Sequence, residues 1–232
     1  MDESLIAENL GELRLRIENR CRSNRIEPSS VTILGVTKFI PAEAAAVAVK
    51  LGLADLGENR VQEAAIKIAK VTPRPRWHLI GHLQKNKVKK AVEIFDVIES
   101  VDSLELAESV SSRAEEMGKR MEIFLQVNSS GEPTKHGFDP GEIQGFADKI
   151  NELRGLKLSG LMTMGPLTED IDLIKKSFEL TRSVFEKIGK SVGTGFSRLS
   201  MGMSGDYELA IDYGTNEIRI GTAIFGYRPI TK

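Results

Sequence analysis

The sequence has one cysteine, no marked net charge and no long hydrophobic run, and each shortage excludes a class of protein. The single Cys21 cannot form an internal disulfide, which excludes a disulfide-stabilised scaffold. The 32 basic and 33 acidic side chains nearly balance, so charge gives no reason to expect a nucleic acid or a membrane surface as partner. Apolar residues still make up 41% of the 232 residues, enough for one large core.

Signals for export or membrane insertion are also missing. No apolar run approaches the roughly 18 residues of a membrane-spanning helix. The opening MDESLIAENLGEL is acidic and lacks the basic and apolar regions of a secretory signal. Together with the lone cysteine, this predicts a cytoplasmic protein. No proline- and serine-rich linker divides the chain, so we expect a single domain over residues 1–232.

Short apolar segments rich in β-branched residues recur along the chain and predict eight strands. They are residues 31–37, 53–57, 77–81, 95–100, 122–128, 157–164, 197–201 and 217–223. Amphipathic or alanine-rich segments separate them. Pro41 and Gly52 frame one predicted helix, Ser103 is a candidate N-cap of another, and a leading helix over residues 5–22 precedes the first strand.

Alternation of strands and helices over the whole chain defines the fold class. Near-continuous apolar strands with helices between them are typical of parallel sheets covered on both faces. About 200 to 250 residues is the usual length of a (β/α)8 barrel. The sequence therefore predicts an α/β protein with a single TIM barrel and an extra N-terminal helix. A doubly wound open sheet is the structural alternative.

Polar side chains capable of chemistry follow several predicted strands. In both parallel architectures the functional groups lie at the carboxyl ends of the strands. Lys38 comes directly after the first strand. Burial lowers the pKa of a lysine, and a neutral amine condenses with aldehydes to form a Schiff base. The alternative is a lysine that reaches solvent or pairs with a carboxylate such as Glu58.

Glycines and hydroxyls gather after the seventh and eighth strands. The segment LSMGMSGDYELAI places Ser200, Gly202 and Ser204 just before a helix, and Gly221 and Thr222 end the eighth strand. Loops in these two places form the common phosphate site of such barrels. Together with the lysine after the first strand, they predict a site for a phosphorylated carbonyl compound.

Histidines and a basic run offer weaker signals. His78 and His82 have no third ligand at a zinc-like spacing, so we expect no metal site. His82 is expected to line the mouth of the site or to cap the next helix, and His136 has no assigned role. Apolar residues interrupt the basic run at 85–90 in helical rhythm, which indicates a solvated helix face and not a nucleic-acid surface.

Seven motifs in order carry a resemblance to a known family. They are GVTKFIP, LGENRVQE, WHLIGHLQKNK, KHGF, LSGLMTM, LSMGMSGDYELAI and EIRIGTAIFG. Over residues 31–228 the chain resembles the pyridoxal phosphate homeostasis protein family, a group of cytoplasmic single-barrel proteins that hold pyridoxal 5′-phosphate. Their fold is similar to the barrel domain of alanine racemase.

The resemblance implies a role for individual residues. Lys38 would hold the cofactor aldehyde as a Schiff base, with Arg219 beside the pyridine nitrogen and Asn59 near the ring. The phosphate would lie against Ser200, Gly221 and Thr222, with Met201 and Gly202 shaping the same loop. The implied cofactor-binding residues are thus Lys38, Asn59, Ser200, Met201, Gly202, Arg219, Gly221 and Thr222.

The same resemblance favours a binding protein over an enzyme. A guanidinium stays charged and only donates hydrogen bonds, so Arg219 would disfavour protonation of the pyridine nitrogen and weaken carbanion stabilisation. We therefore expect a monomer that stores, buffers or delivers the cofactor to pyridoxal-phosphate-dependent apoenzymes. The alternative is a racemase-like enzyme with a minimal site, for which Tyr207 and His82 are the candidate proton donors. A Schiff-base aldolase acting on a sugar phosphate is a third reading, although such enzymes usually take their lysine from a later strand.

Overall fold

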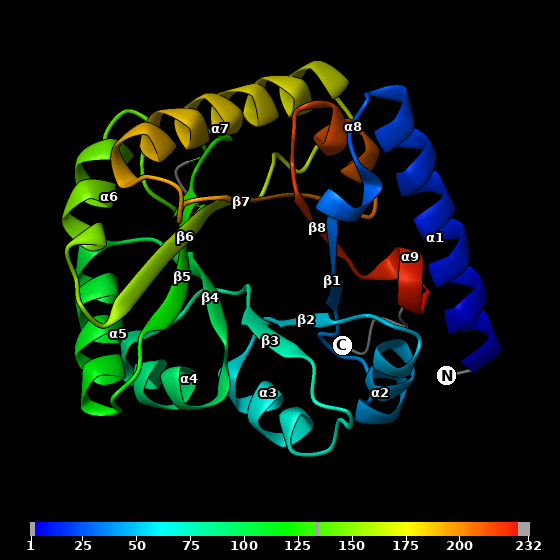
Figure 1. The fold of residues 1–232 in the computed structure, drawn as a ribbon, viewed down its shortest axis with the longest axis horizontal. Coiled ribbons are helices and arrows are strands. Elements are labelled where there is room, and N and C mark those ends of the chain that lie inside the picture. Colours follow the sequence, from blue (N-terminus) through cyan, green and yellow to red (C-terminus); the bar gives the residue numbers. More distant parts are fainter. Residues whose placement is uncertain (1–2, 133–134, 227–232) are drawn as a thin grey trace.

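Eight parallel strands form the centre of the molecule. The structure is a computed structural model that describes residues 3–132 and 135–226. The strands are β1 (Thr32–Val36), β2 (Asp55–Glu58), β3 (Arg76–Leu79), β4 (Val97–Val101), β5 (Met121–Val127), β6 (Leu156–Thr163), β7 (Arg198–Met203) and β8 (Glu217–Ile220). Each pairs with the next, and β8 pairs with β1 through Glu217 opposite Thr32, so the sheet is a closed barrel (Figure 1). This confirms the predicted TIM barrel and excludes the open sheet.

Helices alternate with the strands and surround the barrel. Those within the described residues are α1 (Glu3–Ser23), α2 (Ala42–Lys50), α3 (Val61–Ile68), α4 (Val88–Ile94), α5 (Leu104–Glu116), α6 (Ile143–Asn151), α7 (Ile171–Val192), α8 (Tyr207–Asp212) and α9 (Thr222–Phe225). Ser103 caps α5 as predicted, because its hydroxyl accepts a hydrogen bond from the Leu106 N–H at 3.3 Å. The leading helix is also confirmed, and α1 packs beside α8 and α9 (Figure 1).

Two of the differences between observed and predicted strand ends affect predicted site residues. β7 continues to Met203, so Met201 and Gly202 lie within the strand and not in the loop after it. β8 ends at Ile220, whereas the predicted strand continues to residue 223. The backbone of Gly221 leaves the extended conformation, with φ −111° and ψ −76°, and Thr222 therefore begins α9.

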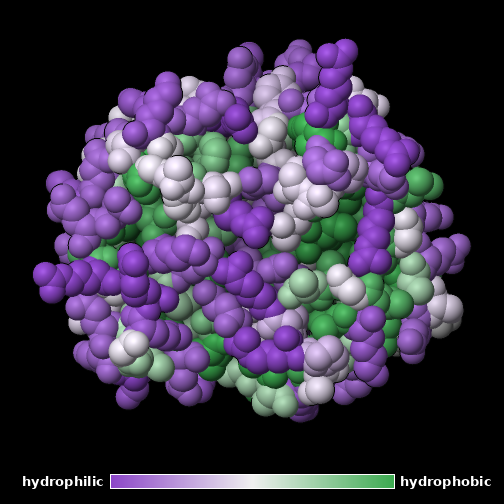
Figure 2. Space-filling view, in the orientation of Figure 1, coloured by the Kyte–Doolittle hydropathy of each residue, from purple (hydrophilic) through white to green (hydrophobic). Residues whose placement is uncertain are grey.

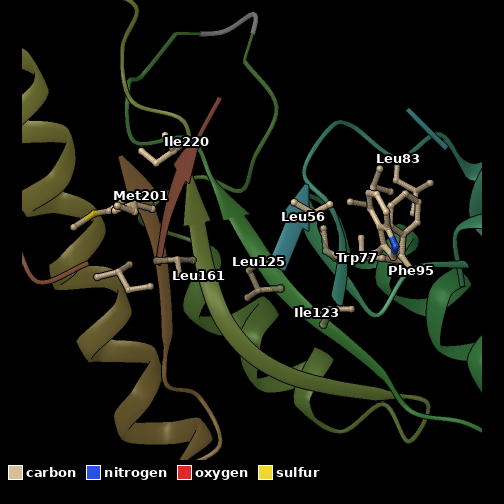
Figure 3. Close-up of a cluster of buried hydrophobic side chains, with 14 of the residues drawn as sticks. Leu56, Trp77, Leu83, Phe95, Ile123, Leu125, Leu161, Met201 and Ile220 are labelled. Carbon is tan, nitrogen blue, oxygen red and sulfur yellow. The ribbon is translucent and has the colours of Figure 1, made fainter. Parts of the chain in front are cut away.

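Hydrophobic side chains fill the layer between strands and helices. Trp77, Leu83 and Phe95 belong to this layer, as does Met201 on the opposite part of the barrel (Figure 3). Because side chains alternate along a strand, a residue next to one of these outward-facing groups points into the barrel. His78 and Ser200 are such residues, and both are fully buried.

The face of the molecule seen in Figure 2 is mainly hydrophilic. Figure 2 shows a face on which hydrophilic residues predominate and hydrophobic ones appear as separate patches. No helix among residues 3–132 and 135–226 has the length and hydrophobicity that crossing a membrane requires.

Candidate functional site

A cavity of about 500 Å³ lies where the carboxyl ends of the strands meet. Its lining comes from the ends of six strands and the loops after them, and consists of Val36, Lys38, Asn59, Ile80, Gly81, His82, Met164, Met203, Ser204, Gly205, Arg219, Gly221 and Thr222. Five of the eight predicted cofactor-binding residues are in this group. A second, more polar cavity of about 550 Å³ adjoins the first and shares Asn59, Gly81 and His82 with it.

Lys38 sits on a tight turn at the end of β1. The Ile40 N–H donates a hydrogen bond to the Thr37 carbonyl at 2.9 Å, which closes a four-residue turn. Phe39 adopts φ +62°, a left-handed conformation that side chains other than glycine seldom take. The Phe39 side chain is exposed while Lys38 is half-buried in the cavity wall. The turn thus directs the lysine inward and the aromatic ring outward.

Glu58 pairs with a lysine other than Lys38. Its Oε1 accepts hydrogen bonds from the Thr37 hydroxyl at 2.6 Å and from the Lys67 amine. Lys67 lies on α3 and is 8% exposed. The alternative in which Glu58 neutralises Lys38 therefore has no support in the contacts of this carboxylate. The sequence signal for Lys67 is its spacing, since it shares one helix face with the buried Val61 and Ala64.

Arg219 forms part of the cavity wall although it is almost fully buried. One guanidinium nitrogen donates to the Ser200 hydroxyl at 2.8 Å and another donates to the Thr163 carbonyl at 2.6 Å. Burial lowers the pKa of Arg219, and the carboxylate of Glu99 partly opposes this. Both bonds fix the guanidinium plane, so its remaining donors have a defined direction.

A hydrogen-bonded network crosses the barrel beneath Arg219. The Ser200 hydroxyl on β7 donates to Glu99 on β4 at 2.7 Å, and these strands are not neighbours, so the contact spans the barrel interior. His78 contacts Glu99 at 2.7 Å and Asp55 at 3.1 Å through its two ring nitrogens. Burial by itself would lower the pKa of His78, but the hydrogen bonds to the two carboxylates outweigh it and raise this pKa to about 10. We therefore expect a buried imidazolium at neutral pH.

Glu217 is the second buried carboxyl group of this interior. It is 1% exposed, and its Oε1 has no hydrogen-bond partner among the described residues. Burial and the nearby charge of Glu99 raise the pKa of Glu217 to about 8, although His78 and Arg198 lower it in part. We therefore expect Glu217 to be neutral at pH 7 and Glu99 to be the ionised partner of His78.

Three predicted residues do not line the cavity. Ser200 lies below it in the network just described, and Met201 points outward into the hydrophobic layer (Figure 3). Gly202 adopts φ +92°, and a Cβ there would lie 2.6 Å from the Cβ of Ala210. The chain re-enters the cavity wall at Met203, Ser204 and Gly205. The Ser204 hydroxyl accepts hydrogen bonds from the N–H groups of Gly221 and Ala223, both at 3.3 Å.

His82 lies at the mouth of the cavity, as its position after β3 predicted. Its ring stacks on that of His136 with 3.8 Å between centroids, and both Nδ1 atoms approach the same oxygen of Asp102, at 3.0 and 3.4 Å. These three side chains offer donor atoms within 4.8 Å of one another. Rings stacked at 13° do not aim their lone pairs at one common point, so this geometry favours a shared hydrogen bond over a metal ion.

Tyr207 is not placed to act as a proton donor in this cavity. It is 3% exposed, its hydroxyl donates to Glu208 at 3.1 Å, and the Arg16 guanidinium lies 5.7 Å from its ring centre. Burial raises the pKa of Tyr207 to about 12. The residue packs toward α1 and is not among the cavity-lining residues.

Comparisons with known proteins identify the family of this chain and confirm its fold. The family model described as "Alanine racemase, N-terminal domain" matches residues 15–229. The pyridoxal phosphate homeostasis protein of Pseudomonas aeruginosa is 37% identical over 226 residues, which cover 97% of this chain and 96% of that protein. The solved structure of PipY from Synechococcus elongatus with PLP bound has a TM-score of 0.84 and 37% identity, and the match covers 95% of this chain and 100% of that one. An alanine racemase from Clostridium difficile shares the fold, at 19% identity and a TM-score of 0.76 over 98% of this chain and 58% of the racemase.

Proposed function

The chain belongs to the family of pyridoxal phosphate homeostasis proteins, and we propose that it binds pyridoxal 5′-phosphate in the cavity beside Lys38. The observation that carries the proposal is the convergence of Lys38, Arg219 and the Gly221–Thr222 corner on one cavity. An amine, a guanidinium and the hydroxyl group of this corner are suited to an aldehyde, a pyridine nitrogen and a phosphate, respectively. PLP is bound in the solved structure of its relative PipY, which supports the choice of ligand.

The residues of the cavity fit such a ligand in size and in chemistry. About 500 Å³ lies within the roughly 300 to 1,000 Å³ of ordinary small-molecule sites. Val36, Ile80 and Met164 provide apolar and polarisable contacts for a flat ring, and Asn59 adds an amide at its edge. Ser204, Gly221 and Thr222 would hold the phosphate. Ser200 would act one step away, by holding Arg219.

We further propose that Lys38 carries the cofactor covalently. When bound, pyridoxal 5′-phosphate supplies an aldehyde, and a neutral lysine amine forms a Schiff base with an aldehyde by releasing one water. Arg219 would donate to the pyridine nitrogen and leave it unprotonated, since a guanidinium keeps its proton. The site would then hold the cofactor without activating it. We propose storage, buffering or delivery to apoenzymes by a cytoplasmic monomer, without catalytic turnover.

An absorption experiment tests the binding site. The purified protein, incubated with pyridoxal 5′-phosphate, should be yellow, and borohydride should fix the cofactor to the tryptic peptide that contains Lys38. Lys38→Ala should lose the Schiff-base absorbance, whereas Lys70→Ala, a change at an exposed lysine, should retain it. A wild-type protein that stays colourless with the cofactor would contradict the proposal.

Delivery needs a separate experiment, because binding does not establish transfer. The loaded protein should restore activity to a pyridoxal-phosphate-dependent apoenzyme. Direct transfer would make the rate rise with apoenzyme concentration, whereas release through solvent would fix it at the dissociation rate of the loaded protein. Failure to activate any apoenzyme over hours would leave storage as the only role.

A racemase-like activity is the second candidate. The observation in its favour is His82, which lines the same cavity and is oriented by Asp102. Tyr207, the other proton donor considered from the sequence, is directed away from the cavity. Incubation of the loaded protein with single-enantiomer amino acids in deuterated water decides the matter, since a racemase must exchange the α-proton. Absence of exchange would eliminate this candidate.

A further inference from the structure

Lys67 is a lysine in a place where lysines are rare. It is 8% exposed on the face of α3 that packs against the barrel, and Glu58, its partner, is fully buried. Taking two charges out of water is costly, and a pair of well-packed apolar residues often serves stability as well or better. The contacts of this pair therefore need an explanation other than stability.

The pair joins two of the strand ends that carry cavity residues. The Lys67 amine donates to the Thr37 carbonyl at 2.6 Å and to Glu58, and the Thr37 hydroxyl donates to Glu58 at 2.6 Å. Thr37 directly precedes Lys38, and Glu58 directly precedes Asn59. One ammonium group thus holds β1 and β2 at the points where each delivers a side chain to the cavity.

The turn that carries Lys38 is one that needs such support. Phe39 has φ +62°, and a strained residue of this kind persists only where its surroundings hold the backbone in place. The Thr37 carbonyl accepts both the Ile40 N–H, which closes the turn, and the Lys67 amine. The first residue of the strained turn is therefore anchored from the side of α3.

We propose that Lys67 and Glu58 form a clamp that positions Lys38 and Asn59 for capture of the cofactor. The contacts above establish the clamp itself, whereas its role in cofactor binding rests on the proposed function. Lys67 does not line the cavity, so it is a positioning residue that acts through the backbone of Thr37. Without the clamp the turn opens more often, and the amine of Lys38 spends less time facing the ligand.

The test needs a variant that folds. Lys67→Met alone leaves Glu58 buried without its cation and is expected to destabilise the whole protein. The double variant Lys67→Met with Glu58→Gln removes both charges, keeps both shapes and retains an oxygen that accepts from the Thr37 hydroxyl. Lys70→Met, at an exposed lysine three residues further along, is the matched control.

Hydrogen exchange measures the clamp without the cofactor. In the double variant the Ile40 amide, which closes the turn, should exchange about tenfold faster than in the wild-type protein, as expected for the loss of one charge-assisted hydrogen bond. The Leu125 amide in β5 should exchange at the wild-type rate. Acceleration of both amides to the same extent would indicate general loss of stability and would overturn the proposal, as would no acceleration at Ile40.

Cofactor binding then tests whether the clamp contributes to holding the ligand. The double variant should bind pyridoxal 5′-phosphate about tenfold more weakly, mainly through faster dissociation, and Lys70→Met should bind as the wild type does. Wild-type affinity in a double variant whose Ile40 amide exchanges faster would overturn the positioning role. A wild-type protein that binds no cofactor would contradict the proposed function instead, and the exchange measurement alone would then decide whether the clamp exists.

Discussion

Glu217→Gln offers a quantitative test of the buried network beneath Arg219. Glu217 is 1% exposed, and burial together with the charge of Glu99 raises its pKa to about 8. The charged groups that face it are Glu99 on β4, His78 on β3 and Arg198 and Arg219 around it. A glutamine reproduces the neutral carboxyl group in shape and never ionises. The variant therefore separates the charge of Glu217 from its packing.

The sign of the effect follows from proton binding. In the unfolded chain a glutamate releases its proton at about pH 4.3, whereas folded Glu217 keeps it up to about pH 8. The folded state binds the extra proton between these values, so its stability is fully present below the lower one and falls as pH rises through the window. From about pH 5.5 to the folded pKa of about 8, a loss of about 1.4 kcal/mol per unit amounts to roughly 3 kcal/mol. Glu217→Gln should not show this loss.

Urea unfolding at two pH values measures the difference. Between about pH 5.5 and about pH 8.5 the free energy of unfolding of the variant should gain roughly 3 kcal/mol over that of the wild type. His78, with its pKa raised to about 10, loses stability over a higher window in both proteins. Glu43→Gln, at an exposed glutamate, is the control and should show no pH-dependent gain. An equal offset between variant and wild type at both pH values would refute a protonated Glu217.

Further substitutions test other parts of the structure, each by urea unfolding. Gly202→Ala should cost about 3 kcal/mol, since its Cβ would lie 2.6 Å from that of Ala210 at φ +92°; a wild-type midpoint would contradict this packing. Ser103→Ala should cost about 1 kcal/mol by removing the cap of α5, and no loss would mean that the cap is not formed in solution. Ser200→Ala should cost about 1 to 3 kcal/mol and weaken cofactor binding, because it removes one hydrogen-bond partner from each of Glu99 and Arg219; unchanged binding would separate Ser200 from the site.

The barrel was predictable because its signals are local. Apolar segments at regular intervals define the strands, and helical spacing defines the segments between them. The strand-end rule then located Lys38, Gly221 and Thr222 without any knowledge of which side chains meet, and the family resemblance added Asn59 and Arg219. For the first three residues, position along the chain was sufficient.

The predicted phosphate contacts after β7 did not all reach the cavity, and the reason is a change of register. The pairing of β7 with β8 shifts between Ser200 and Met203, and Gly202 in this interval has a positive φ. Such an irregularity re-aims the side chains that follow it. Ser200 consequently stays below the cavity while Met203 and Ser204 line it. The spacing of apolar residues carries no signal for this shift.

The role of Lys67 was hidden for a different reason. Its helix position indicated burial, but its partners Thr37 and Glu58 lie 30 and 9 residues away along the chain. The pairing of β1 with β2 and the packing of α3 on β2 bring them together. Glu99 and Ser200 are 101 residues apart on strands that are not neighbours, and they meet across the interior of the closed barrel.

The pairing of β1 with β8 determines when the barrel can close. Thr32 pairs with Glu217, so during synthesis the backbone N–H and C=O groups on one edge of β1 stay unpaired until β8 has left the ribosome. An exposed strand edge is a template for pairing with other chains. A nascent chain that stalls before residue 217 therefore forms no closed barrel. It is a sheet with two unpaired strand edges, and we expect such a chain to bind chaperones.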